Sequence, residues 1–318
     1  MLTFFTTAKP FQGHNALIQR NALQSWKRLY PEAEIILFGK DEGVAEVCAE
    51  LGLRHEPEII VNPSGTKRLD SIFGRAQEIA SKNLLCYANC DIVLTKDFRV
   101  ALEQLLEWRR QFLMVGRRWD TDIVAPIDFS SQAWEQEIVD LAHREGCHRF
   151  YHNIDYFLFP RGLYGEIPPL VIGRIGWDPW LIGKAHASGT AVVDVSDRVC
   201  AVHQNHDYGY HPQGMTGVWN DEEARRNLEL AQGIRSMTIE DAAYRLTGEG
   251  LVRNRWCWLA PAKRAYRDVV RSVRGWVRTR LWHPLLDRSR SARHSLGLSR
   301  DAVPKALRSR QRRHWMDR

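Results

Sequence analysis

The segment Asn89-Cys90-Asp91 directly follows an apolar run that is expected to form a strand. Ligands of open α/β sheets bind beyond the carboxyl ends of the strands, so Asp91 at this position can hold a hard cation such as Mn²⁺ or Mg²⁺. Such a cation neutralises a diphosphate leaving group, which a side chain alone does poorly. An Asp after a strand can equally be a turn residue or a helix N-cap, so the motif alone leaves both interpretations open.

A second motif lies at residues 174–180, where Trp177 and Trp180 flank Asp178. Indole faces suit the apolar faces of sugar rings, and a nearby carboxylate can take the proton of an acceptor hydroxyl. We therefore expect Asp178 to be a catalytic base and both tryptophans to lie on the acceptor side. The alternative is an aromatic corner of the core in which Asp178 only begins a helix.

Two further polar groups could contribute to such a site. His203 and His206 follow an expected strand, and neutral imidazole is a common ligand of Mn²⁺ and Zn²⁺, although a polar loop without metal fits the same spacing. Asp120 and Asp122 follow two arginines and suit metal or sugar hydroxyls, and they are expected, together with His206, on the acceptor side. The neighbouring arginines could pair with phosphate, or all four charges could form a surface ion-pair network.

Strand and helix patterns alternate with short connections over most of the chain, which predicts an α/β fold with a mostly parallel sheet flanked by helices. Strands are expected at 2–7, 34–38, 84–88, 112–115, 154–159 and 191–195, and helices at 15–29, 43–51 and 69–80. We expect a catalytic domain over 1–225, a helical linker over 226–260, and a basic amphipathic helix with a tail over 261–318.

The basic residues concentrate in that last part of the chain. Residues 251–318 hold 19 Lys and Arg against 4 Asp and Glu, whereas the first 250 residues hold 26 against 34. Over 262–281, arginines recur at steps of three and four on one face, and valines with Tyr266 and Trp276 occupy the other. Nucleic acid needs no apolar face, whereas a lipid interface does, so the expected partner is an anionic membrane surface and no nucleic acid.

Other patterns limit the class of protein. The sequence holds no GxGxxG, GxxxxGK[ST] or GxSxG motif, which disfavours dinucleotide enzymes, P-loop NTPases and α/β-hydrolases. The six cysteines form no CxxC pair and fit no zinc spacing, so we expect reduced thiols. With neither a signal peptide nor a membrane span in the sequence, the expected location is cytoplasmic, at the inner face of a membrane.

The order of these motifs resembles one known fold over roughly residues 2–215. TTAKPF, an SW-containing helix, EIILFG, YANCDIVL, FLMVGRRWD, DYFLFP, GWD and HQNHDY follow one another along the chain. This order is similar to the GT-A fold of nucleotide-diphospho-sugar glycosyltransferases, in a family-2-like form. The Asn-Cys-Asp segment resembles the DxD motif of that family, with Asn89 in place of the first Asp.

The resemblance implies a role for several residues. Asp91 and His203 would hold Mn²⁺ or Mg²⁺, and Asp178 would be the base of an inverting enzyme. The donor nucleotide and diphosphate would be held by Thr6, Thr7, Lys9, Arg68, Asn89 and Asp91.

The implied activity is transfer of a sugar from a nucleoside diphosphate to a glycan or lipid-linked acceptor. One alternative is a sugar-nucleotide nucleotidyltransferase, although AKPFQGHN stands where those enzymes carry a glycine-rich loop. The other is a nucleic-acid-binding protein that acts through the basic tail.

Overall fold

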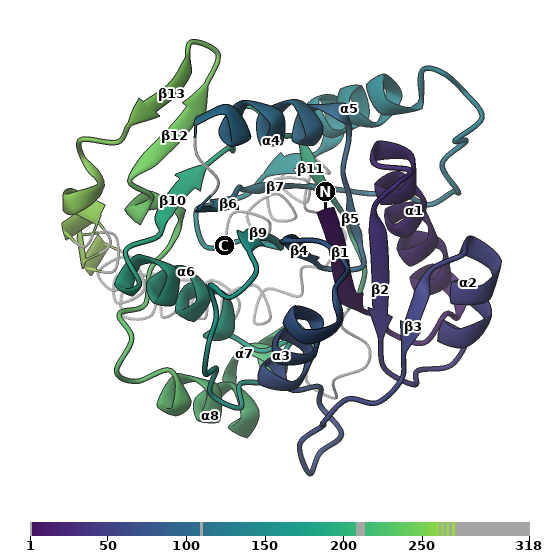
Figure 1. The fold of residues 1–318 in the computed structure, drawn as a ribbon, viewed down its shortest axis with the longest axis horizontal. Coiled ribbons are helices and arrows are strands. Elements are labelled where there is room, and N and C mark those ends of the chain that lie inside the picture. The colour runs from purple at the N-terminus through teal and green to yellow at the C-terminus, as the bar shows by residue number, and fades with distance from the viewer. Residues whose placement is uncertain are drawn as a thin grey trace, which may run out of the picture. The chain divides into compact units, whose positions relative to one another are not determined.

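A computed structural model of the chain describes residues 2–108, 111–207 and 214–260, together with 262–263, 265–266 and 269–270 (Figure 1). Contacts divide the chain into a unit over 1–258 and a second over 259–318. The short 3₁₀ helix η2 (Cys257–Leu259) spans this boundary. The strands and helices named next belong to the first unit.

Nine strands form the main sheet, in the order β13-β12-β10-β6-β9-β4-β1-β2-β3. These strands are β1 (Leu2–Thr7), β2 (Glu34–Phe38), β3 (Arg54–Glu56), β4 (Leu84–Ala88), β6 (Phe112–Val115), β9 (Tyr156–Pro160), β10 (Ala191–Asp194), β12 (Tyr244–Thr247) and β13 (Gly250–Arg253). Most neighbours are parallel; β9 runs antiparallel between β4 and β6, and β13 is antiparallel to β12.

Helices connect these strands. They are α1 (Gly13–Leu29), α2 (Val44–Leu51), α3 (Leu69–Ile79), α4 (Lys96–Trp108), α5 (Trp134–Glu145), α6 (Trp177–Ala187), α7 (Gly214–Asn220), α8 (Glu222–Leu230) and the 3₁₀ helix η1 (Ile239–Asp241). The predicted α/β fold with a mostly parallel sheet flanked by helices is therefore confirmed.

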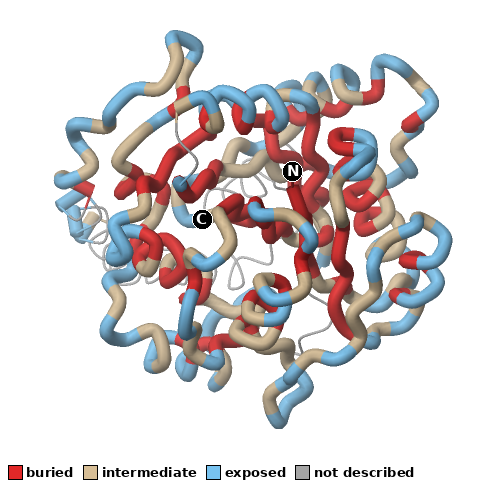
Figure 2. Tube along the Cα trace, viewed as in Figure 1, coloured by how far each residue is buried: buried red, intermediate tan, exposed pale blue. Residues whose placement is uncertain are grey.

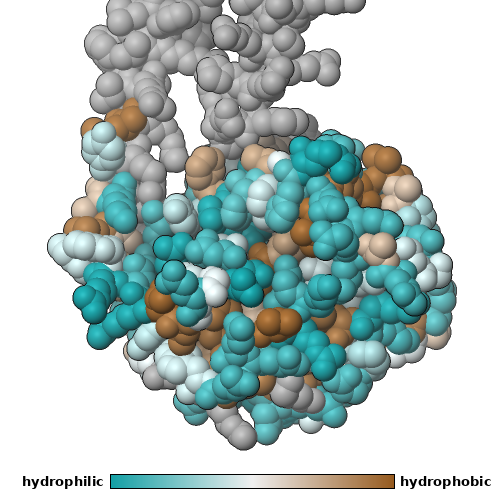
Figure 3. All heavy atoms as spheres, turned by 90° about the horizontal axis from the view of Figure 1, so that it is seen from above, coloured by the Kyte–Doolittle hydropathy of each residue, from teal (hydrophilic) through white to brown (hydrophobic). Residues whose placement is uncertain are grey.

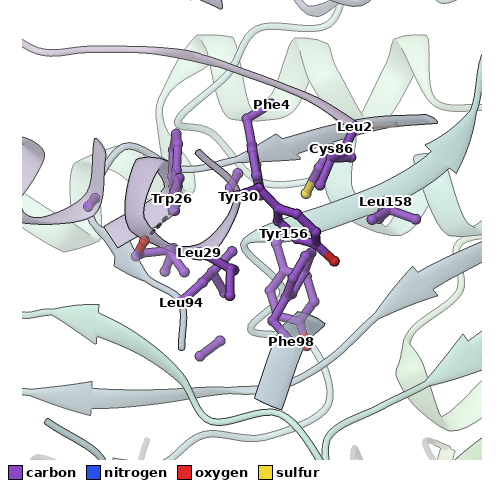
Figure 4. Packing of buried hydrophobic residues seen from close by; sticks show 14 of the residues in the cluster. Leu2, Phe4, Trp26, Leu29, Tyr30, Cys86, Leu94, Phe98, Tyr156 and Leu158 are labelled. Atoms are coloured by element: carbon purple, nitrogen blue, oxygen red, sulfur yellow. Dashed lines mark hydrogen bonds between the residues drawn. The ribbon is translucent and has the colours of Figure 1, made fainter. Parts of the chain in front are cut away.

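Strand β1 explains why helices cover both faces of the sheet. Successive side chains of a strand point to opposite faces, and both Phe4 and Phe5 are fully buried. Phe4 packs with Trp26 of α1 and Phe98 of α4, whereas Phe5 packs with Phe73 of α3. Figure 2 shows the resulting buried strands at the centre, and Figure 4 shows the Phe4 side of this core.

A second, smaller sheet carries the polar motifs of the sequence. Its strands, in the order β5-β11-β7-β8, are β5 (Ile92–Val93), β11 (Ala201–Gln204), β7 (Arg118–Thr121) and β8 (Cys147–His148). Strand β11 is antiparallel to β5 and parallel to β7. Segments that are far apart in the sequence therefore meet at β11.

The expected helical linker over 226–260 is wrong. After α8, the chain forms the hairpin β12–β13, and β12 pairs with β10 at one end of the main sheet. Only Leu246 of this hairpin is fully buried, and the apolar pattern of its sequence is too weak to predict the two strands.

Among the residues that the structure describes, no helix is long and apolar enough to cross a membrane. Figure 3 shows mainly hydrophilic side chains on the visible face of the described residues, with scattered hydrophobic ones.

Most of the predicted amphipathic helix over 262–281 lies outside the described residues. All six cysteines are free, in agreement with the expected reduced thiols.

We expect Trp26→Phe to lower the free energy of unfolding by about 1–3 kcal/mol, because the indole Nε1–H donates to the buried backbone oxygen of Ile92 at 2.9 Å, which the variant leaves unpaired. Chemical denaturation measures this change. Trp256→Phe is the control, since that ring is 63% exposed and its replacement should change stability by no more than about 0.5 kcal/mol. Equal effects of the two variants would contradict the assignment of Trp26 to the core.

Candidate metal and acid–base site

The centre of the site is a cluster of Asp91, His203 and His206, with one ligand atom of each lying within 4.8 Å of the others. His206 Nε2 lies 3.3 Å from Asp91 Oδ2, and His203 Nε2 lies 3.8 Å from the same oxygen. The sequence predicts Asp91 and His203 as a metal pair, and the structure brings them together. It adds His206, which had been expected on the acceptor side, to the same cluster.

The small sheet explains this convergence. Asp91 immediately precedes β5, and the register of β5 and β11 pairs Ile92 with His203. On the other side of β11, the register with β7 pairs His203 with Asp120. Hydrogen bonding between three strands thus fixes the positions of two carboxylates around one imidazole.

The cluster suits a divalent cation. Burial opposes the ionisation of Asp91, but the neighbouring His203, His206 and Lys9 outweigh it and hold the pKa of this carboxyl well below its usual range. Asp91 Oδ1 is also buried without a hydrogen-bond partner in the described part of the chain. An ionised carboxylate with an unpaired oxygen and two imidazoles is a donor set that Mn²⁺ and related ions accept.

Lys9 borders the same cluster. Its Nζ lies 3.2 Å from His206 Nε2 and 3.3 Å from His206 Nδ1. Burial lowers the pKa of Lys9 and outweighs the opposing influence of Asp91 and Asp207. Lys9 was expected to contact the donor, and its ammonium group is located where it could approach a phosphate beside a metal ion.

A buried ion-pair network lies behind His203. Arg118 contacts Asp120 Oδ1 through Nε at 2.7 Å and Asp155 Oδ2 through Nη1. Arg149 Nε lies 3.1 Å from Asp120 Oδ2. Burial opposes the charge on Arg118, but the two carboxylates outweigh it and raise the pKa of the guanidinium. Of the two earlier interpretations of Asp120, the ion-pair network agrees with this geometry, but the network is buried rather than on the surface.

Asn89 belongs to that network. Its Nδ2 donates to Asp155 Oδ1 at 2.6 Å, and its Oδ1 accepts a hydrogen bond from the Tyr87 hydroxyl at 3.0 Å. Both ends of the amide are therefore used by protein groups. This differs from the expected donor-binding role and gives Asn89 a structural one.

Asp178 lies in the first turn of α6, after Gly176, whose φ of 103° few other residues adopt. Burial raises the pKa of the Asp178 carboxyl to about 8, and the charge of Asp155 acts in the same direction. A carboxylate whose pKa lies near neutrality suits proton transfer. The charge of Arg118 acts in the opposite direction to that of Asp155 and favours the ionised carboxyl.

The two tryptophans beside Asp178 are core residues. Trp177 is 5% exposed and contacts Tyr87 and Phe157, and Trp180 is 3% exposed. Their expected role on the acceptor side does not agree with this burial, which leaves little of either indole open to a sugar ring. The aromatic-corner alternative describes them correctly.

The remaining expected residues are spread more widely. Thr6 is fully buried in β1, so its hydroxyl is not accessible to a nucleotide, whereas Thr7 at the strand end is partly exposed. Arg68 precedes α3 and contacts Asp70 through Nε and Nη2, at 3.1 and 2.5 Å. Asp122 is exposed and accepts a hydrogen bond from Asn205 Nδ2 at 2.8 Å.

Two members of the site were not found from the sequence. Asp155 precedes β9 and is 6% exposed, and Arg149 follows β8. The signal available for Asp155 was its position near the start of the apolar run IDYFLF. A carboxylate that is buried with such a run needs a charged or hydrogen-bonding partner. Arg149 lies in a polar stretch that offers no comparable signal.

No protein-family model matches the chain, and no curated protein matches it. Solved structures do resemble it. Glucosyl-3-phosphoglycerate synthase of Mycobacterium tuberculosis has a TM-score of 0.46 at 14% identity over 74% of this chain and 81% of that one. It has also been solved with Mn²⁺, uridine diphosphate and phosphoglyceric acid.

TarS of S. aureus (residues 1–349) with UDP-GlcNAc has a TM-score of 0.47 at 11% identity over 72% of this chain and 65% of that one. A second structure of TarS 1–349 has a TM-score of 0.43 at 10% identity, and the match spans 64% of this chain and 60% of the TarS chain.

The raised pKa of Asp178 predicts a pH-dependent stability. The folded protein keeps a proton on this carboxyl up to about pH 8, whereas the unfolded chain releases it near the ordinary value of 3.8. The folded state therefore loses stability as the pH rises between these two values. Asp178→Asn cannot ionise, so its gain in unfolding free energy over wild type should be larger at pH 9 than at pH 5.

Chemical denaturation at both pH values measures this difference in the metal-free protein. Asp140→Asn is the control, because Asp140 is exposed on α5. A gain that is the same at both pH values would show that Asp178 titrates normally.

Proposed function

We propose that this protein is a metal-dependent glycosyltransferase that moves a sugar from a nucleoside diphosphate donor to a hydroxyl acceptor. The observation that carries the proposal is the cluster of Asp91, His203 and His206, in which Asp91 follows β4. The charges of Asp155 and Arg118, which belong to the network behind this cluster, also act on the pKa of Asp178. The two carboxyls have opposite pKa shifts: that of Asp91 is lowered, and that of Asp178 is raised. Such a pair supports different roles for two residues of the same type.

In this mechanism Asp91, His203 and His206 hold the divalent cation, which when bound neutralises the negative charge of the departing diphosphate. Lys9 contributes a second positive charge beside the cluster. Asp178 in its ionised form accepts the proton of the acceptor hydroxyl as the new glycosidic bond forms. The acceptor is proposed to be a glycan or a lipid-linked molecule.

We expect Asp91→Asn to abolish metal-dependent transfer, since it removes the anionic ligand but keeps the size of the side chain. Release of nucleoside diphosphate from a panel of UDP-, GDP-, CDP- and ADP-sugars measures the activity. The accompanying binding test measures the unfolding temperature in the presence of each nucleoside diphosphate, with and without Mn²⁺. The nucleoside diphosphate together with Mn²⁺ should raise the unfolding temperature of wild type more than that of Asp91→Asn.

Asp140→Asn provides the matched control for both measurements. Full Mn²⁺-dependent activity in Asp91→Asn would overturn the role of this carboxylate. Release of pyrophosphate instead of nucleoside diphosphate would identify a nucleotidyltransferase.

We also propose that the protein binds the anionic surface of a membrane on its cytoplasmic side. The amphipathic pattern over 262–281 motivates this proposal, and the described residues just before it support it. Trp256 and Trp258 are 63% and 68% exposed, and Arg253 and Arg255 beside them are exposed as well. Exposed tryptophan suits the depth of the lipid interface, and arginine suits anionic headgroups.

The membrane proposal predicts that full-length protein floats with vesicles containing phosphatidylglycerol and not with pure phosphatidylcholine. Replacing Arg253, Arg255, Trp256 and Trp258 by serine should reduce flotation, because each basic residue near an anionic surface contributes on the order of 1 kcal/mol. The control variant Trp219→Ser/Arg226→Ser changes the same residue types on α7 and α8. Binding to DNA in place of vesicles would contradict the proposal.

A further inference from the structure

The imidazole of His203 lies between two carboxylates. Its Nε2 faces Asp91 Oδ2 at 3.8 Å, and its Nδ1 lies 3.2 Å from Asp120 Oδ1. The ring is 6% exposed, so protein groups rather than bulk water determine which nitrogen carries the proton. The proton position matters because only a nitrogen without a proton can ligate a metal ion.

The position of Asp120 is fixed independently of His203. The parallel pairing of β7 with β11 places Asp120 directly opposite His203 in the small sheet. Arg118 Nε contacts one oxygen of Asp120 at 2.7 Å, and Arg149 Nε contacts the other at 3.1 Å.

These contacts make Asp120 unsuitable as a metal ligand or a sugar contact. Both of its oxygens face the guanidinium groups of arginine, and a cation beside them would be repelled. Oδ1, which Arg118 contacts, also lies 3.2 Å from Nδ1 of the His203 imidazole. A carboxylate in this position can accept a hydrogen bond from the non-ligating nitrogen of a metal-binding histidine and so orient its ring.

We propose that Asp120 is a positioning residue for the metal site, which accepts the Nδ1–H of His203 and so leaves Nε2 as the metal-ligating nitrogen. The proposal rests on the metal site of the proposed function. Arg118 and Arg149 hold the Asp120 carboxylate in place through one contact to each of its oxygens. The twin-arginine segment before Asp120 thus supports the metal site from behind, rather than pairing with phosphate.

The experiment compares Asp120→Ala, which removes the acceptor, with Asp120→Asn, which keeps a neutral oxygen acceptor at the same position. Affinity for Mn²⁺ without nucleotide is measured from the free-ion signal in electron paramagnetic resonance. We expect Asp120→Ala to bind Mn²⁺ about 10–100-fold more weakly than wild type, and Asp120→Asn to be affected less. The matched control is Asp221→Asn, because Asp221 also pairs with an arginine, Arg174 at 2.7 Å, and should leave the affinity unchanged.

A second readout needs no metal. Nitrogen NMR of the metal-free protein, with the His203 signal assigned by its loss in His203→Gln, should show the proton on Nδ1 in wild type. Thermal unfolding identifies any variant that fails to fold. If Asp120→Ala fails to fold, the Mn²⁺ affinity of Asp120→Asn and the wild-type ring signal test the role of Asp120 instead.

Wild-type affinity in a folded Asp120→Ala, or a wild-type proton on Nε2, would overturn the role of Asp120. If the wild type binds no Mn²⁺, the metal site of the proposed function is wrong. The ring signal then still decides separately whether Asp120 accepts the proton of His203.

Discussion

The buried guanidinium of Arg118 holds together two carboxylates that would otherwise repel each other. The side chains of Arg118, Asp155 and Asp120 are 11%, 9% and 15% exposed, so water screens their charges only weakly. Removing one partner of such a group leaves an uncompensated buried charge, which typically costs about 3–5 kcal/mol. Through Asp155 this guanidinium also fixes Asn89 at the end of β4, and through Asp120 it reaches His203.

This arrangement separates the electrostatic environments of two carboxylates in one site. Asp91 faces two imidazoles and an ammonium group, which keep it ionised and ready to bind a cation. The burial of the Asp178 carboxyl and the negative charge of Asp155 favour its protonated form. The metal role proposed for Asp91 and the proton-transfer role proposed for Asp178 therefore depend on the neighbours of each residue and not on its type.

The small sheet supplies the geometry that these electrostatics need. Strands β5, β11 and β7 come from three separate parts of the chain, and their register places Ile92, the neighbour of Asp91, and Asp120 on either side of His203. The core beneath them is tied to the same place, because Trp26 of α1 donates to the backbone of Ile92, next to Asp91. The core and the candidate metal site are thus connected through the short segment that contains Asp91 and Ile92.

The sequence by itself determined the α/β fold, most strands of the main sheet and the meeting of Asp91 with His203. Apolar runs and helical periodicity are local signals, and strand ends carry the polar residues. It did not reveal the β12–β13 hairpin, in which only Leu246 is buried, or the core position of Trp177 and Trp180, since exposure is not encoded in residue type. The remaining features of the site could be seen only in the folded chain. Asp120 pairs with arginines and faces His203, and the amide of Asn89 hydrogen-bonds with Tyr87 and Asp155. Likewise, the pKa of Asp178 is raised. Each of these depends on strand register and burial, which arise from contacts between segments far apart in the chain.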